Sequence, residues 1–172
     1  MDTASLPLPR RQAGELLAGP LGALRAHWPE YLMEAWGLGT FMVSAGAFGT
    51  LLFHPASPVA RAVADPLALR ALMGALMGLT AVALIYSPWG RQSGAHLNPA
   101  VTLTFLRLGK VRPWDALFYV LAQAAGGTAG VLLVAAALGP FFREPPVAYL
   151  ATVPGEAGAA AALLAEALIS LV

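Results

Sequence analysis

The residues of this sequence that could do chemistry are few and lie far apart. His27, His54 and His96 are scattered along 172 residues, and no pair of carboxylates lies beside any of them. The sequence contains no cysteine, which excludes disulfides, thiol catalysis and cysteine-based metal sites. Because an enzyme needs a nucleophile with its base or a metal cluster, we expect no enzyme, no metal and no other cofactor.

One polar stretch is notable for its surroundings. Ser93–Thr102 reads SGAHLNPAVT and separates two of the most apolar parts of the chain. Asn98 is a favoured N-cap residue, because its side-chain oxygen can accept hydrogen bonds from the first turn of a helix. Pro99 suits the first helical position, and Gly109 favours a stop. The pattern predicts a half-helix over residues 99–107, about 13 Å long, or about half the hydrocarbon thickness of a bilayer.

Such a short helix either lies on a membrane surface or enters the membrane and stops near the middle. Apolar side chains cover much of its circumference, which favours burial. Non-helical backbone at membrane depth persists only where protein or a water-filled cavity surrounds it. The helix N-terminus then carries partial positive charge near the midplane, and the Asn98 amide can offer its N–H groups to the lumen. This arrangement repels cations and indicates a channel for neutral solutes.

The composition around this stretch is typical of a helical membrane protein. Hydrophobic residues make up 58% of the chain and charged residues 11%, whereas a soluble domain has about a quarter charged. Three segments are long and apolar enough to cross a bilayer, at about 31–53, 67–89 and 114–138. Residues 157–172 are apolar but too short for a full crossing, and we interpret them as the start of a fourth span. The net charge of +1 gives no reason to expect a nucleic-acid partner.

Basic residues predict the orientation in the membrane. They precede the first span and cluster between the second and third, at Arg10, Arg11, Arg25, Arg91, Arg107, Lys110 and Arg112. The positive-inside rule therefore places the N-terminus in the cytoplasm and residues 139–156 in an extracytoplasmic loop. Residues 1–30 form a cytoplasmic tail that is either mobile or an amphipathic helix on the membrane surface. The apolar side of that helix would carry Leu16, Leu17, Leu21 and Leu24.

The string SGAHLNPAVT closely resembles the first signature of the aquaporin and glycerol-facilitator family, the major intrinsic proteins. The resemblance covers about Tyr31 to the C-terminus. It implies an all-α membrane fold, a right-handed bundle of two inverted repeats that each have three spans and a re-entrant half-helix. Residues 31–138 would form the first repeat. It also implies a homotetramer in the cell membrane that passes water or small neutral solutes such as glycerol across the lipid bilayer.

The resemblance also implies roles for the polar stretch. Asn98 would donate to the passing solute, while Pro99 and Ala100 would pack on a partner motif at the midplane. The loop before them would line the cytoplasmic half of the pore with Gly94, Ala95, His96 and Leu97. For His96, lining the pore and bracing the loop are equally open. Metal binding is disfavoured there, because no second ligand is near.

Two acidic residues and one stretch of the second span complete the candidate site. Glu34 matches the glutamate of the family's first span, where it would accept hydrogen bonds from backbone N–H groups of the re-entrant loops. Glu166 repeats this pattern in the fourth span, as inverted repeats require. Gln123 matches a glutamine of the third span, with packing as its expected role. The filter position falls at Met77 or Gly78, neither of them aromatic.

The family has a second Asn-Pro-Ala motif followed by an arginine, and this sequence has one motif and ends within its fourth apolar segment. Three explanations are open. The first, which we favour, is an incomplete sequence of an ordinary channel. The others are a half-channel that needs a second copy and a membrane fragment that does not conduct. A secondary transporter also uses broken helices, but Glu34 and Glu166 are its only candidate intramembrane charges.

Overall fold

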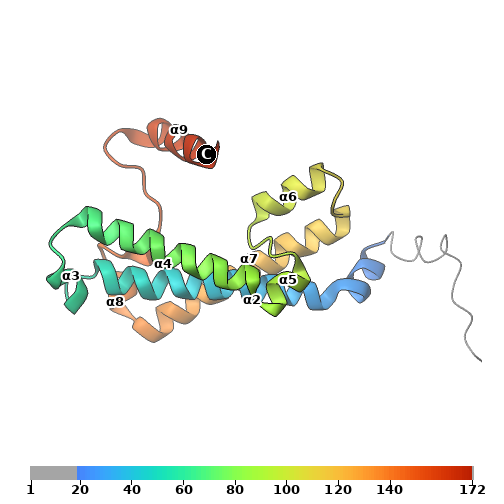
Figure 1. Cartoon of the computed structure of the whole chain (residues 1–172), viewed down its shortest axis with the longest axis horizontal. Coiled ribbons are helices and arrows are strands. Elements are labelled where there is room, and N and C mark those ends of the chain that lie inside the picture. The colour runs from blue at the N-terminus through green and yellow to red at the C-terminus, as the bar shows by residue number, and fades with distance from the viewer. Residues whose placement is uncertain (1–18, 172) are drawn as a thin grey trace, which may run out of the picture.

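The three longest helices lie side by side along the long axis of the molecule (Figure 1). The structure is a computed structural model that describes residues 19–171, and every regular element in that range is helical. Helices α2 (Pro20–Phe53), α4 (Pro66–Tyr86) and α7 (Pro113–Leu138) are long and apolar enough to cross a membrane. The predicted all-α fold class is therefore confirmed.

The shorter elements connect or follow these three helices. They are α3 (Pro58–Ala62), α5 (Pro88–Ser93), α6 (Pro99–Arg107), α8 (Pro140–Arg143), η1 (Ala148–Leu150) and α9 (Gly158–Leu171). Each α-helix from α2 to α8 begins with a proline. Proline is favoured at this position because its ring presets the helical φ angle and its missing N–H would have no partner there. Seven prolines thus start helices, whereas Pro29 lies inside α2, two residues after the backbone becomes non-helical at His27.

Two helix boundaries differ from the predicted ones. The helix that holds the second span ends at Tyr86 rather than Trp89, because the Ser87 hydroxyl accepts from Gly90 N and Pro88 starts the separate helix α5. Helix α2 begins at Pro20, within the predicted tail, and its backbone breaks at His27 (φ −128°, ψ 18°). Of the leucines proposed for an amphipathic tail, those at 16 and 17 lie outside the described residues.

Helices α2 and α7 are in backbone contact. A Cβ atom at Gly126 would lie 2.0 Å from the Ala35 carbonyl oxygen, and one at Gly130 would lie 2.4 Å from the Gly39 carbonyl oxygen. Only glycine allows such an approach, since any larger residue would overlap main-chain atoms that cannot move aside. This contact sets the register of the two helices and brings Glu34 of α2 beside α7.

Helix α4 packs less closely than its two neighbours. Its glycine pair, Gly74 and Gly78, has no atom within 4 Å of an added Cβ among the described residues. Helix α9 follows a stretch without regular structure and lies apart from the three long helices (Figure 1). The tight core of the described chain is therefore the α2–α7 pair, with α5 and α6 at one end and α8 at the other.

Candidate functional site

Glu34 is the centre of the most densely hydrogen-bonded group in the structure. Its side chain is fully buried. Oε1 accepts from the Ser93 hydroxyl at 2.7 Å and from the His96 backbone N–H at 3.0 Å. Oε2 accepts from the Leu97 backbone N–H at 2.7 Å and from Gln123 Nε2 at 2.8 Å. Both oxygens therefore have two donors, which is what a buried carboxylate needs to offset its lost hydration.

The loop that Glu34 holds has an unfavourable backbone. Gly94, Ala95 and Leu97 all lie in the left-handed region, with φ of 88°, 46° and 49°. Glycine adopts this conformation freely, but Ala95 and Leu97 each carry a cost of about 1 kcal/mol or more. Such strain persists where the surroundings over-determine the conformation. The Glu34 carboxylate supplies that constraint, because it binds the N–H groups of two successive loop residues.

Every N–H group of this loop is used, whereas its carbonyl groups are free. Gly94 N donates to the Gly90 carbonyl at 2.9 Å and Ala95 N donates to the Ser93 hydroxyl at 3.2 Å. The next two N–H groups bind Glu34, as described above. Among the described residues, no hydrogen bond ends on a carbonyl oxygen of residues 94–97. The loop thus offers a row of acceptors and no donor.

Asn98 follows the loop and caps α6. Its Oδ1 accepts from Ala100 N at 2.8 Å, and its backbone lies in the extended region before the helix starts at Pro99. The side chain is exposed, and Nδ2 makes no hydrogen bond to the part of the chain that the structure describes. The amide is therefore oriented by its oxygen and has two N–H donors to offer.

Thr102 joins the loop to α7 one turn further along α6. Its side chain is fully buried, and Oγ1 lies 3.0 Å from His96 Nδ1 and 3.1 Å from Gln123 Nε2. Gln123 thus donates to both Thr102 and Glu34, so its role extends beyond the helix packing expected of it. Its Oε1 is buried and has no partner among the described residues.

The His96 ring is enclosed by aromatic side chains and is 8% exposed. It stacks on Phe105, with ring centroids 4.8 Å apart and planes at 9°, and it meets Tyr119 edge-on at 5.0 Å. Tyr119 in turn donates its hydroxyl to the Ser93 carbonyl at 2.7 Å. The ring therefore packs against protein on several sides, and His96 also lines the chamber described below.

Several predicted positions lie outside this network. Glu166 is exposed on α9 and shares none of the Glu34 hydrogen bonds. On α4, Met77 is half-buried and Gly78 is exposed. The sequence analysis in turn missed Ser93, Thr102, Tyr119 and Phe105. A signal for two of them was available, because Thr102 follows Asn98, and Gln123 follows Tyr119, by the four residues that place side chains on one helix face.

A chamber of about 500 Å³ opens beside the loop. It is lined by residues from the start of α2, the loop, the end of α6 and the start of α7: His27, Glu30, Gln92, Ser93, Gly94, His96, Phe105, Lys110, Val111, Asp115 and Tyr119. The described residues hold no group of three side chains that could bind a metal. Charged side chains, among them Glu30, Lys110 and Asp115, stand in a wall that is otherwise mainly apolar, and the chamber adjoins the loop at Gly94 and His96, so part of the wall can hydrogen-bond to water.

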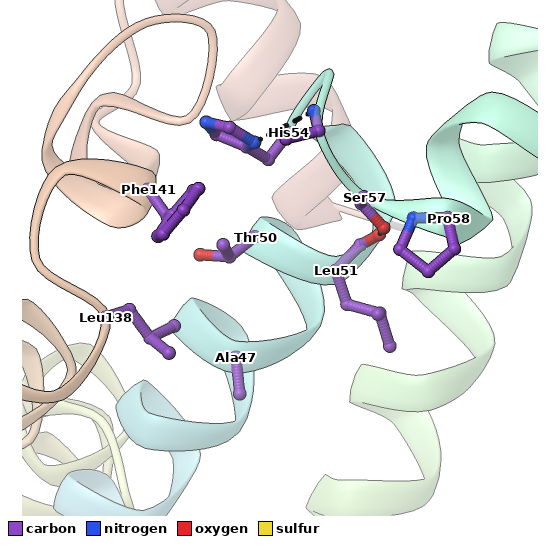
Figure 2. A pocket seen from close by; sticks show the side chains of 9 residues that line it. Ala47, Thr50, Leu51, His54, Ser57, Pro58, Leu138 and Phe141 are labelled. Atoms are coloured by element: carbon purple, nitrogen blue, oxygen red, sulfur yellow. Dashed lines mark hydrogen bonds between the residues drawn. The ribbon is translucent and has the colours of Figure 1, made fainter.

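A second cavity, of about 430 Å³, lies at the other end of the helices (Figure 2). Its wall is mainly apolar, and its polar side chains bond to nearby backbone. Thr50 donates to the Gly46 carbonyl at 2.8 Å, Ser57 donates to the Leu51 carbonyl, and His54 Nδ1 accepts from Ala56 N at 3.1 Å. Each of these side chains is bonded to backbone of its own segment, and no loop is held here as residues 94–97 are held by Glu34, so the loop beside Glu34 is the stronger candidate site.

Comparison with known families agrees with the motif and the fold. Residues 28–172 match the family described as Major intrinsic protein. The chain belongs to this family. Because three of its described helices can also cross a bilayer, this major intrinsic protein is a membrane protein. No solved structure matches the chain.

Several curated relatives of this major intrinsic protein are named as aquaporins. Aquaporin A of Dictyostelium discoideum is 45% identical over 83 residues, which are 48% of this chain and 29% of the relative. Putative aquaporin NIP4-1 of Arabidopsis thaliana is 42% identical over 94 residues, 54% of this chain and 31% of the relative. Aquaporin Z of Photorhabdus laumondii is 35% identical over 101 residues, 58% of this chain and 41% of the relative. The matched region spans less than half the length of each relative.

Proposed function

We propose that this major intrinsic protein forms a channel through which water and small neutral solutes such as glycerol permeate passively. The observation that supports this most directly is the division of hydrogen-bonding groups in residues 94–98. The loop N–H groups are bound internally, the loop carbonyls are free, and the Asn98 amide is free to donate. A molecule with hydroxyl groups can donate to the carbonyls and accept from Asn98 as it moves along this stretch.

The half-helix α6 adds the electrostatic part of the mechanism. Its nine residues extend about 13 Å, so its N-terminus at Asn98 and Pro99 would lie near the membrane midplane if the loop re-enters. The partial positive charge of a helix N-terminus disfavours cations. Glu34 is fully buried and its four hydrogen-bond donors all come from the protein, so it is not a ligand for a solute on the path.

The proposal extends to the membrane arrangement. Residues 31–138 serve as the first repeat, residues 139–156 as an extracytoplasmic loop, and residues 157–172 as the start of a fourth span. The N-terminus lies in the cytoplasm of a cell that carries the protein in its plasma membrane, as the distribution of basic residues favours. The chain associates into a homo-oligomer, for which the family resemblance is the support.

Stopped-flow light scattering on proteoliposomes tests the channel. The vesicles are shrunk osmotically to measure water flux, and glycerol uptake is followed in a separate series. We expect faster shrinkage than in empty vesicles, with a weak temperature dependence, because pore permeation avoids the cost of entering lipid. Water and glycerol fluxes that both equal those of empty vesicles would contradict the proposal that this chain conducts by itself.

A further inference from the structure

The first turns of α2 are set apart from the rest of the helix by the break at His27. This break lies at the end of the molecule that also carries α5 and α6 (Figure 1). Two residues on its inner side contact one carboxylate oxygen of α7. His27 Nδ1 lies 2.8 Å from Asp115 Oδ1, and the Tyr31 hydroxyl lies 2.7 Å from the same atom. Asp115 therefore latches the broken start of α2 to the first turn of α7.

The inner and outer sides of this segment differ sharply. On the inner side Ala23 is 2% exposed, and its carbonyl lies 3.1 Å from the Tyr31 hydroxyl. On the outer side Leu21 is 67% exposed and Trp28 is 55% exposed. Leu24 and Arg25 are also exposed and lie between them. The spacings of three and four residues from Leu21 place Leu24 and Arg25 on its helix face, and this stripe is followed beyond the break by the exposed Trp28.

Exposed apolar side chains also follow the break, on the membrane-spanning part of α2. Leu32 and Trp36 are exposed one and two turns after Trp28, and Trp36 packs edge-on against Trp89 of α5 with ring centroids 4.8 Å apart. Exposed apolar residues therefore lie on both sides of the break, at the end of α2 from which the span begins.

We propose that residues 20–28 are an interfacial helix that Asp115 holds against α7, and that its partner is a lipid surface with anionic headgroups. Leu21, Leu24 and Trp28 enter the boundary between headgroups and acyl chains, and Arg25 pairs with lipid phosphate or carboxylate. Leucine, tryptophan and arginine suit this depth, because apolar area and positive charge both favour an anionic interface. Residues 20–28 contain no acidic side chain that would oppose this binding.

The absence of cysteine from the sequence makes a spin-label experiment direct. Single labels are placed at Leu24→Cys on the stripe and at Ala26→Cys, which is exposed but off the stripe. The protein is reconstituted in phosphatidylcholine with or without phosphatidylserine. With both lipids present, we expect the label at 24 to be relaxed mainly by oxygen, which concentrates in lipid. The label at 26 should be relaxed mainly by a water-soluble nickel chelate.

The charge of Arg25 is tested in the same vesicles. Removing phosphatidylserine, or the substitution Arg25→Gln, should lower the ratio of membrane-inserted to water-exposed label at position 24 by about fivefold. This is the effect on binding of one basic residue near an anionic surface. A label at 24 that is as accessible to the nickel chelate as the label at 26, in both lipids, would overturn the proposal.

The latch is tested by removing its charge. Asp115→Asn should make the spin label at 24 more mobile, which narrows the lines of its electron paramagnetic resonance spectrum. Tyr31→Phe removes one hydrogen-bond donor to Asp115 and should increase the mobility less. Glu144→Gln removes an exposed carboxylate at the end of α8 and should leave the spectrum unchanged. Unchanged mobility in both latch variants would overturn the role of Asp115. None of these measurements depends on solute flux, so their outcome is separate from that of the channel proposal.

Discussion

Glu34 shows how one side chain can support a strained segment far away in the sequence. Its four donors come from Ser93, His96, Leu97 and Gln123, at separations of 59 to 89 residues. The carboxylate is suited to this task, because it accepts at both oxygens and donates at neither. A neutral amide of the same shape would present N–H groups to donors that need an acceptor.

Glu34→Gln should therefore destabilise the protein. Its amide nitrogen would face two of the four donors, and lost hydrogen bonds to a charged group cost about 1.5–3 kcal/mol each when buried. We expect a lower denaturation midpoint in detergent and faster amide exchange at His96 and Leu97. Glu30→Gln is the matched control, since Glu30 accepts a single hydrogen bond from the described residues, from Gln92 Nε2 at 3.2 Å. Equal losses in the two variants would contradict the bracing role of Glu34.

Two threonines of α6 provide a sharper comparison. Thr102 is buried and its hydroxyl lies within hydrogen-bond distance of His96 and Gln123, whereas Thr104 is exposed and bonds to the Ala100 carbonyl of its own helix. Thr102→Val keeps the shape and removes the hydroxyl, and should cost about 1–3 kcal/mol because it leaves buried polar atoms unpaired. Thr104→Val should change stability by less than about 0.5 kcal/mol. Thermal unfolding in one detergent measures both, and a similar shift for the pair would count against the network.

Asn98→Asp tests the electrostatics of the proposed path. A carboxylate can still cap α6, but it places a negative charge where the helix N-terminus otherwise disfavours cations. We expect weaker exclusion of cations, measured as sodium or proton leak in proteoliposomes. Asn98→Ser is the control, because it also caps without adding charge. An unchanged leak together with unchanged water flux in Asn98→Asp would count against the assigned role of Asn98.

Among the elements, the α2–α7 pair carries the site. Its backbones touch at two glycines of α7, and this approach lets Gln123 reach Glu34 across the interface. The sequence shows these glycines as small residues that favour close packing. The helix register determines which of them contact the backbone of another helix. The α4 glycines, with the same spacing as a packing motif, touch nothing within 4 Å among the described residues.

Gly126→Ala and Gly127→Ala should differ although they are neighbours. A Cβ at 126 would lie 2.0 Å from the Ala35 carbonyl oxygen, whereas one at 127 would lie 3.4 Å from the Leu38 side chain. The first clash can be relieved only by separating the helices, which should cost about 1–3 kcal/mol and lengthen the Glu34–Gln123 contact. The second should be nearly neutral. The free energy of unfolding in detergent distinguishes the two variants. A Gly126→Ala variant as stable as Gly127→Ala would contradict the close backbone contact.

For the whole molecule, the proposed orientation makes opposite predictions for two exposed loops. Leu108 lies between α6 and α7, and Ala56 lies between α2 and α3. Leu108→Cys and Ala56→Cys leave the net charge unchanged, and each introduces a single cysteine into a chain that has none. An impermeant maleimide should label Ala56→Cys on intact cells and Leu108→Cys only after the membrane is opened. The reverse pattern would invert the proposed orientation, because that orientation rests on the distribution of basic residues alone.

Properties that depend on local pattern can be predicted from the amino-acid sequence. Long apolar segments predicted three membrane-length helices, Asn98 and Pro99 predicted a short capped helix, and the surrounding string indicated the family. Apolar length and helix capping act within a few residues, so they can be read without knowing the fold. Apolar length alone places the end of α4 at Trp89 rather than Tyr86, because Ser87 and Pro88 lie inside an apolar run and do not interrupt its hydropathy.

The contacts that hold the site depend instead on how the helices pack. The left-handed loop conformation, the enclosed His96 ring and the Thr102–Gln123–Glu34 hydrogen bonds join residues from α2, α6, α7 and the loop. Sequence spacing cannot predict these contacts, since hydrogen bonds between distant residues require a particular helix register. That register follows from where the backbones of α2 and α7 can touch, and so the α2–α7 contact decides which donors reach Glu34.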